Sequence, residues 1–285
     1  MKPAPFEYVA ARSADDVVAA LADGRTEVLA GGQSLVLEMN YRTRRPARLV
    51  DINRVPGFDT VEAIGDTVRI GPLVRHQAFE SGAVPGQLGA LLHRVVRHIA
   101  HPPIRTRGTM LGSLAYAHPA AEWPAVITAL GAELDLVGAG GRRTVAAGDF
   151  FLAPFRTARR PDELLAEVRL PVLPAGTVIG FAEHRRTHAS FAQLAVIAAV
   201  TLADGRVSSA SIGLVNAADR PVRARAAEAA LLGRPLDDPA VAAAARAAAE
   251  QDADPGPQPY TDLAYQRHTV AVLTRRALDQ ARTEG

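Results

Sequence analysis

Apolar positions at helical spacing predict several helices along the chain. Ser13 and Asp16 can form an N-terminal capping box, and Val17, Val18 and Leu21 then share one helix face. Further segments repeat apolar residues three or four positions apart. We therefore predict helices over residues 13–23, 88–100, 122–130, 224–232, 240–250 and 262–281.

Short apolar runs beside turn residues predict strands and hairpins. The runs at residues 26–30 and 48–52 indicate two short buried strands. Gly65-Asp66 and Asp204-Gly205 are two-residue turn sequences that are typical of β-hairpins. The predicted hairpins pair residues 60–64 with 67–70, 133–137 with 143–145, and 191–202 with 206–215.

This order of elements predicts an α+β protein of more than one domain. The length of 285 residues exceeds one average domain, and Pro171, Pro174 and Gly176 mark a plausible boundary. We expect residues 1–172 to form one domain, with lobes at about 1–55 and 56–172. Residues 173–285 are expected to form a smaller α+β domain with an antiparallel sheet and helices.

Composition excludes several kinds of chemistry. Lys2 is the only lysine among 32 Lys and Arg residues, so neither an internal Schiff-base lysine nor a lysine-dependent phosphate loop is available. The chain has no cysteine and therefore cannot hold an iron–sulfur cluster, a disulfide or a thiolate zinc site. Any redox chemistry must use an organic cofactor or electrons from another chain.

Charge and hydropathy also limit the partners. The net charge of +2 comes without a dense basic block, so we do not expect nucleic acid as a partner. Residues 1–16 lack the apolar core of a signal peptide. The longest apolar stretch, Leu194 to Ala203, is shorter than the ~20 residues that cross a bilayer. We expect no membrane span and a cytoplasmic protein.

A first candidate binding loop follows a predicted buried strand and reads Ala30-Gly31-Gly32-Gln33-Ser34-Leu35. Glycines allow a turn in which backbone N–H groups face an anion, and Ser34 adds a hydroxyl donor. A helix starting here would direct its dipole at a phosphate. The alternative is a tight strand-to-helix turn without a ligand. The spacing matches neither a Rossmann fingerprint nor a Walker loop.

A second candidate loop reads Ile-Arg-Thr-Arg-Gly-Thr-Met-Leu-Gly-Ser-Leu at residues 104–114. Its arginines could neutralise a diphosphate, and its glycines would let the backbone approach. A solvated loop is the alternative. Two such loops, each attached to one lobe, fit a dinucleotide that is held between the lobes.

A third segment, His118-Pro-Ala-Ala-Glu122-Trp-Pro124, follows directly. The carboxylate of Glu122 could accept hydrogen bonds from a ribose or ribityl hydroxyl, or it could simply answer a helix dipole. His118 is interpreted as a loop residue, because no serine or aspartate partner pattern accompanies it. No histidine has the spacing of a metal site, so we predict neither a metal nor a catalytic acid or base.

These segments, in this order, resemble the FAD-binding medium subunit of the molybdenum hydroxylases, a family that includes aerobic carbon monoxide dehydrogenase and bacterial xanthine dehydrogenase-like enzymes. The resemblance lies in Ala30–Leu35, in Arg45-Pro46 with Val50-Asp-Ile-Asn53, and in residues 100–124. It continues in Phe181-Ala-Glu183 with the 191–200 strand, in Gly213-Leu-Val215, and in the 223–233 and 265–278 helices. Most of the chain is covered.

The resemblance implies a two-lobed FAD domain of the vanillyl-alcohol-oxidase type, followed by a C-terminal domain of the carbon monoxide dehydrogenase flavoprotein type. By matching position, two loops would hold the FAD diphosphate and one carboxylate would contact its sugar. The residues so implied are Ala30, Gly31, Gly32, Gln33, Ser34, Leu35, Thr109, Met110, Leu111, Gly112, Ser113 and Glu122.

The resemblance also implies an oxidoreductase complex. In this class a large subunit oxidises substrate at a molybdenum cofactor, and two 2Fe–2S clusters on a small subunit pass electrons to FAD on the medium one. The chain would then be the FAD-bearing electron-transfer subunit, with both other subunits as partners in a dimer of heterotrimers. The absence of cysteine agrees with FAD as its own cofactor.

Three departures from the family pattern stand out. Leu111 replaces the first glycine of a T-I-G-G pattern, which puts the close backbone approach there in doubt. Glu122 replaces a common aspartate. Asn40-Tyr-Arg42 replaces Lys-Leu-Arg, a variant that is closer to members that oxidise N-heterocycles. Two alternatives remain: a free-standing FAD-dependent reductase of the same fold, and a scaffold subunit that has lost flavin.

Overall fold

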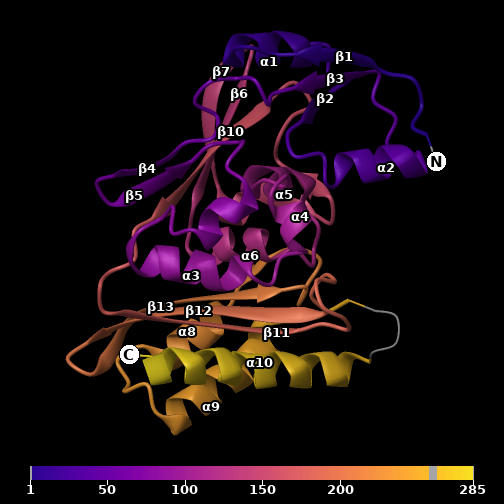
Figure 1. Ribbon diagram of the computed structural model, residues 1–285. Helices are drawn as coiled ribbons and strands as arrows, with labels where there is room; N and C mark the ends of the chain where they lie inside the picture. Colours follow the sequence, from indigo (N-terminus) through magenta and orange to yellow (C-terminus); the bar gives the residue numbers. More distant parts are fainter. Residues whose placement is uncertain (1, 257–261, 285) are drawn as a thin grey trace.

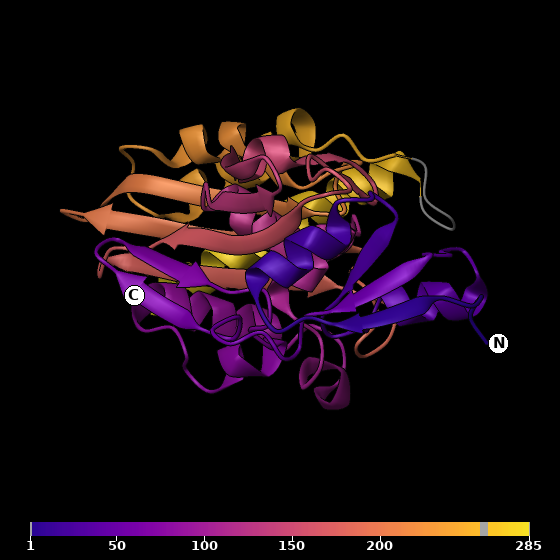
Figure 2. The ribbon, with the colours of Figure 1, turned by 90° about the horizontal axis from the view of Figure 1, so that it is seen from above.

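A computed structural model describes residues 2–256 and 262–284 of the chain. Three larger sheets, each with its own helices, follow one another from top to bottom in Figure 1, and Figure 2 shows the same arrangement from above. A fourth sheet in the described residues is a two-stranded pair within residues 151–157. The chain passes through the three larger sheets in order. Each is built from strands that are consecutive in sequence, except that the second sheet also includes a later strand, residues 164–171.

The first sheet is small and parallel. It consists of β1 (Glu7–Ala10), β3 (Arg48–Asp51) and β2 (Thr26–Leu29), in that order. The connections are α1 (Ala14–Leu21) and α2 (Leu35–Tyr41). The predicted capping box at the start of α1 is confirmed, since Ser13 Oγ accepts from Asp16 N while Asp16 accepts from the backbone of Ser13. The first candidate loop therefore connects β2 to α2.

The second sheet is antiparallel and carries the largest core. Its order is β4 (Val61–Ile64), β5 (Thr67–Ile70), β10 (Leu164–Pro171), β6 (Glu133–Gly138) and β7 (Gly141–Ala146). The other elements of this lobe are η1 (His76–Glu80), α3 (Gly86–Val96), α4 (Pro102–Arg105), α5 (Met110–Tyr116), α6 (Glu122–Ala129), α7 (Ala147–Phe150), β8 (Phe151–Ala153) and β9 (Arg156–Thr157). The second candidate loop connects α4 to α5.

The third sheet is an antiparallel meander of β11 (Thr177–His184), β12 (Leu194–Ala203), β13 (Arg206–Val215) and β14 (Val222–Arg223). One face packs against α6: a Cβ on Gly213 would lie 2.8 Å from the carbonyl oxygen of Ala125. The helices on the other side are α8 (Arg225–Leu231), α9 (Asp238–Ala247), the π-helical turn η2 (Ala248–Asp252) and α10 (Leu263–Glu284). A Cβ on Gly180 would lie 1.8 Å from the Ala277 oxygen, so α10 lies directly on β11.

The three predicted hairpins are confirmed, and both Asp204 and Gly205 adopt positive φ angles (50° and 71°), as their turn type requires. Two local predictions were wrong. The helix predicted over 88–100 ends at Val96, because the chain tightens there into turns in which the N–H groups of His98 and Ile99 donate three residues back, and Ala100 then has a left-handed φ of 49°. Residues 101–109, which follow the helix predicted over 88–100 and were expected to form a loop, contain α4. None of the helices in the described residues has the length and apolar character that a membrane crossing requires.

Candidate functional site

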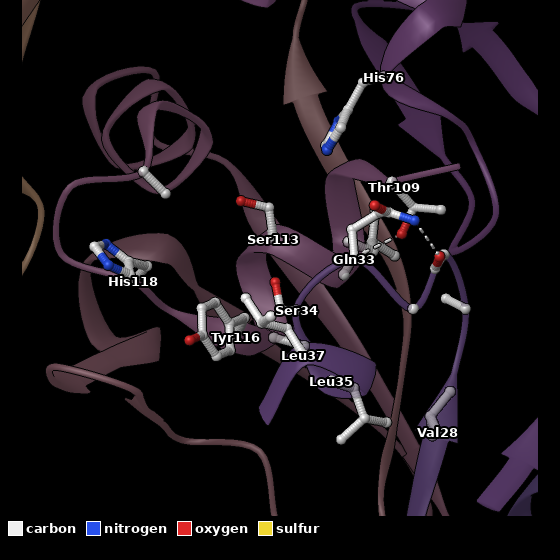
Figure 3. Close-up of a pocket in the computed structure, with 18 of the residues that line it drawn as sticks. Val28, Gln33, Ser34, Leu35, Leu37, His76, Thr109, Ser113, Tyr116 and His118 are labelled. Atoms are coloured by element: carbon white, nitrogen blue, oxygen red, sulfur yellow. Dashed lines mark hydrogen bonds between the residues drawn. The ribbon is translucent and has the colours of Figure 1, made fainter. Parts of the chain in front are cut away.

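A cavity of about 400 Å³ lies where the first two lobes meet (Figure 3). Its walls come from the first candidate loop with α2, from the second candidate loop with α5, and from the segment between β11 and β12. All but one of the twelve residues that the family resemblance assigned to FAD line this cavity: Ala30, Gly31, Gly32, Gln33, Ser34, Leu35, Thr109, Leu111, Gly112, Ser113 and Glu122. The exception is Met110, which is fully buried in the core of the second lobe.

The first loop approaches the second through its backbone. A Cβ on Gly31 would lie 2.1 Å from the carbonyl oxygen of Arg107, so a side chain at this position cannot be accommodated without moving the backbone. Gly32 has a φ angle of +73°, a conformation that glycine adopts without strain. The two glycines therefore serve different purposes: Gly31 permits contact between the loops, and Gly32 permits the turn.

Hydroxyl groups stand at the starts of both helices that border the cavity. Ser34 is the N-cap of α2 but makes no side-chain capping hydrogen bond. Thr109 caps α5, and its Oγ1 accepts from the N–H of Gly112 at 3.0 Å. Figure 3 shows Ser34 and Ser113 in the cavity, one from each helix. Helix starts with free N–H groups and nearby hydroxyls favour an anion.

Leu111 does not fill the space between the helix starts. Its side chain is 2% exposed and belongs to the core cluster of the second lobe. The leucine at this position therefore packs inward, and the backbone of α5 continues to border the cavity.

Arg105 has a role that the sequence did not predict. Its guanidinium donates to the carbonyls of Ile99 and Ala100 at 2.9 Å and lies 2.8 Å from Glu80. Neither Arg105 nor Arg107 lines the cavity. The arginines that were expected to neutralise a bound diphosphate therefore do not stand in the cavity wall, and Arg105 holds the turn after α3.

A hydrogen-bonded strap connects the two loops, and sequence reasoning missed it. Asn53 donates to the carbonyl of Ala30 in the first loop. Arg75 donates both to Asn53 Oδ1 and to the carbonyl of Arg107 in the second loop. Asn53 belongs to the Val50–Asn53 motif, whereas no motif in the sequence indicated a role for Arg75. The strap holds the two loops at a fixed separation.

Glu122 occupies the first turn of α6, at the inner wall of the cavity. Its side chain is buried, and burial together with the nearby Glu183 carboxylate raises the pKa of Glu122 to about 8. At neutral pH the group is mainly protonated. It can therefore donate a hydrogen bond as well as accept one, whereas the sequence argument considered only acceptance.

Aromatic rings close one end of the cavity. His118 stacks on Phe191 with ring centroids 3.9 Å apart and planes within 3°. Phe155 packs edge-on against both His118 and Tyr116. His118 thus lies in a ring cluster, as expected of a loop residue without an acid–base partner, and burial lowers its pKa.

Family models match nearly the whole chain. The model described as the FAD-binding domain in molybdopterin dehydrogenase matches residues 4–173, and the carbon monoxide dehydrogenase flavoprotein C-terminal domain matches residues 180–281.

Several known proteins are similar to this chain over most of its length. The chain is 37% identical to 6-hydroxypseudooxynicotine dehydrogenase complex subunit alpha of Paenarthrobacter nicotinovorans, over 99% of this chain and 96% of that one. It is 37% identical to caffeine dehydrogenase subunit beta of Pseudomonas sp. strain CBB1, over 83% and 81%. A carbon monoxide dehydrogenase structure from Hydrogenophaga pseudoflava has a TM-score of 0.94 at 35% identity, with 99% of each chain covered.

Proposed function

Because this chain belongs to the family of FAD-binding medium subunits of molybdenum hydroxylases, we propose that it holds FAD between its first two lobes and works as an electron-transfer subunit. It would take electrons from the 2Fe–2S clusters of a partner subunit and pass them to an external acceptor. The observation that carries this proposal is the cavity where the two glycine-containing loops meet. Bound FAD supplies the electron-carrying ring, while the protein supplies position and electrostatics.

The residues around the cavity fit a dinucleotide. Gly31 brings the backbones of the two loops into contact, and Ser34 keeps a hydroxyl that no capping bond uses. We assign the diphosphate to the helix starts at Ala30–Leu35 and Thr109–Ser113, with Met110 contributing only backbone. The inward packing of Leu111 supports this assignment, because its side chain leaves the helix start open.

Glu122 is assigned to a sugar hydroxyl of the cofactor. Its protonated carboxyl group offers one donor and one acceptor, which suits a hydroxyl that can do both. Its burial in the first turn of α6 fixes its position in the cavity wall.

The partners are proposed as a large molybdenum-cofactor subunit and a small iron–sulfur subunit, assembled as a dimer of heterotrimers. The chain cannot carry clusters itself because it has no cysteine. The relatives named above are themselves subunits of complexes, which supports a multi-subunit assembly. The division into domains at 1–172 and 173–285 and a cytoplasmic location remain predictions.

The substrate of the complex is proposed to be an N-heterocyclic compound. Two relatives at 37% identity are named for 6-hydroxypseudooxynicotine and for caffeine. Asn40-Tyr-Arg42, which forms the end and C-cap of α2, supports the same class. The substrate pocket itself would lie on the large subunit, so the test is turnover of the purified complex with a panel of purines and pyridines against carbon monoxide.

Release of the cofactor tests the central part of this proposal. We expect non-covalent binding, since no cysteine is present for attachment. Acid precipitation of the purified chain should therefore give a yellow supernatant that chromatographs as FAD. A colourless protein would favour the flavin-free scaffold, and colour retained in the pellet or FMN in the supernatant would contradict the proposal. A free-standing reductase would release FAD too, and is distinguished by its assembly state.

A further inference from the structure

His76 lies at the cavity, although no motif of the sequence pointed to it. It begins η1, and its backbone N–H donates to the carbonyl of Gly108 at 2.9 Å, which fixes it to the second loop. The side chain is 6% exposed and lines the cavity. In the view of Figure 3 its ring extends toward the space beside Thr109 and Ser113.

The protonation of this ring follows from its partner. Trp123 donates its indole N–H to Nδ1 of His76 at 3.0 Å. Because an indole can only donate, Nδ1 must accept, and a neutral ring must then carry its proton on Nε2. Burial and the charges of Arg105 and Arg75 lower the pKa of His76 to about 3, so the ring is neutral at physiological pH. Phe79 packs on Trp123 with ring centroids 5.3 Å apart and fixes the indole.

The Nε2–H group is free to bond a ligand. Among the described residues, the side-chain hydrogen bond of this ring uses only Nδ1. Nε2 borders Gly108: a Cβ on that glycine would lie 2.9 Å from it. Gly108 also follows Arg107, the residue that Gly31 touches. The donor is therefore located where the two loops come closest.

Few cationic groups are available at this point of the cavity. The arginines that line it are Arg44, which pairs with Glu27 and Glu38, and Arg159, which donates to the carbonyls of Arg160 and Glu163. Arg75 and Arg105, whose charges act on His76, do not line the cavity and bond to protein groups. A diphosphate placed between the loops is therefore bound mainly by neutral donors. Backbone N–H groups and hydroxyls supply some of them, and a buried imidazole N–H is a further one.

We propose that His76 donates a hydrogen bond from Nε2 to a diphosphate oxygen of FAD, and that Trp123 is a positioning residue that fixes the tautomer. The proposal rests on the assignment of FAD to this cavity. A hydrogen bond to a charged acceptor is stronger than one between neutral groups, so its loss should weaken FAD binding by about tenfold or more.

Two substitutions at this position separate the two ring nitrogens. His76→Asn keeps an acceptor near the Nδ1 position for Trp123 but has no group at the Nε2 position. His76→Gln places an amide N–H near the Nε2 position. His93→Asn, on α3 and outside the cavity lining, is the matched control. Each full-length chain is stripped of flavin, checked for folding by circular dichroism, and titrated with FAD by quenching of flavin fluorescence.

We expect at least about a tenfold rise in the dissociation constant for His76→Asn, substantial recovery for His76→Gln, and no change for His93→Asn. Equal affinity of His76→Asn and wild type would overturn the role of His76 while leaving FAD binding intact. If the wild-type chain itself binds no FAD, the proposed function fails instead. A loss in both His76 variants with native folding would also count against the donor role.

Magnetic resonance tests the assignment without relying on activity. Nitrogen-15 spectra of the FAD-bound chain should show His76 protonated at Nε2 and unprotonated at Nδ1 between pH 6 and 8. The phosphorus-31 signals of bound FAD should move in His76→Gln, while the visible absorption bands of the flavin stay in place. A charged ring, the opposite tautomer, or a shift confined to the absorption bands would overturn the assignment to the diphosphate.

Discussion

The two lobes that border the cavity differ greatly in how firmly they support their loops. The second loop rests on a cluster of 35 buried hydrophobic residues among those described, seven of them within residues 179–215 of the C-terminal part. The cluster of the first lobe has eight, and two of these, Leu73 and Leu164, come from the second lobe. The first lobe also exposes large apolar side chains on β1 and α2, including Tyr8, Leu37 and Tyr41 at 55%, 54% and 64%. The first loop therefore depends on its contacts with the second loop, and a cofactor that bridges both should stabilise the first lobe most.

The largest effect is expected where the two loops touch. Gly31→Ala places a methyl group 2.1 Å from the Arg107 oxygen, so the loops must separate. We predict a loss of FAD affinity of about a hundredfold or more, since a displacement near 1 Å is costly in a preorganised site. Gly32→Val should also reduce FAD content, because Gly32 has a φ angle of +73°, which glycine adopts far more readily than valine. Flavin titration measures both, with Gly148→Ala as a control, because Gly148 has open space around it, no positive φ and no place in the cavity lining. Retention of full FAD content in Gly31→Ala would mean that the first loop is misassigned.

Replacing one buried leucine by alanine in each lobe tests the difference between the two lobes directly. Leu92 in α3 and Leu21 in α1 are both fully buried, one in each cluster. Either Leu→Ala change should cost about 2–5 kcal/mol locally. For Leu92→Ala we expect this loss in the main urea transition. For Leu21→Ala we expect weaker FAD binding with a smaller change in that transition. The proposed difference between the lobes is wrong if both variants shift the urea transition by the same amount and have the same FAD affinity.

The strap between the loops should have an intermediate effect. Arg75→Gln removes the donors to Asn53 and to the Arg107 carbonyl, and thereby loosens the first loop. We expect FAD affinity to fall by about tenfold, which corresponds to ~1.4 kcal/mol. The exposed Arg54, replaced by Gln, is the matched control. An Arg75 variant that binds FAD as wild type does would show that the loops hold their spacing without the strap.

The last prediction concerns stability rather than FAD affinity, and it involves pH and Glu122. The pKa of its carboxyl rises from 4.5 in the unfolded chain to about 8 in the folded one, so the folded chain binds more protons between these values. Stability should therefore fall as pH rises from about 4.5 to 8, by at most about 1.4 kcal/mol per pH unit from this group, and level off above. Glu122→Gln should remove this slope in the flavin-free chain. The exposed Glu62→Gln on β4 should leave it in place. Identical slopes in wild type and Glu122→Gln would contradict the raised pKa.

Local signals in the sequence predicted much of the fold. The capping box at Ser13, the Asp204-Gly205 turn and the apolar face of α3 depend on neighbours within a few residues, and all are present. β10 was not predicted, because its partners β5 and β6 lie far away in sequence and a bulge between Leu165 and Glu167 interrupts its alternating pattern. β1 is too exposed to give an apolar signal.

The same distinction between local signals and long-range contacts applies to the site. The two glycine-containing loops were recognisable because glycines and hydroxyls are concentrated in each. Arg75 was not, since its partners Asn53 and Arg107 lie 22 and 32 residues away. His76 depends on Trp123, 47 residues away, for its tautomer. Arg105 was misjudged for the same reason, because its contact with Glu80 is set by the fold rather than by the motif.

The most direct test of the account is size-exclusion chromatography of native material, combined with flavin and metal analysis of the active fraction. The account predicts that this chain elutes with two further subunits, and that the active species contains FAD, iron and molybdenum. The isolated FAD-loaded chain should then show no hydroxylase turnover. If the active species is this chain alone, with FAD but without iron or molybdenum, the subunit assignment is wrong and the chain is a free-standing flavoenzyme.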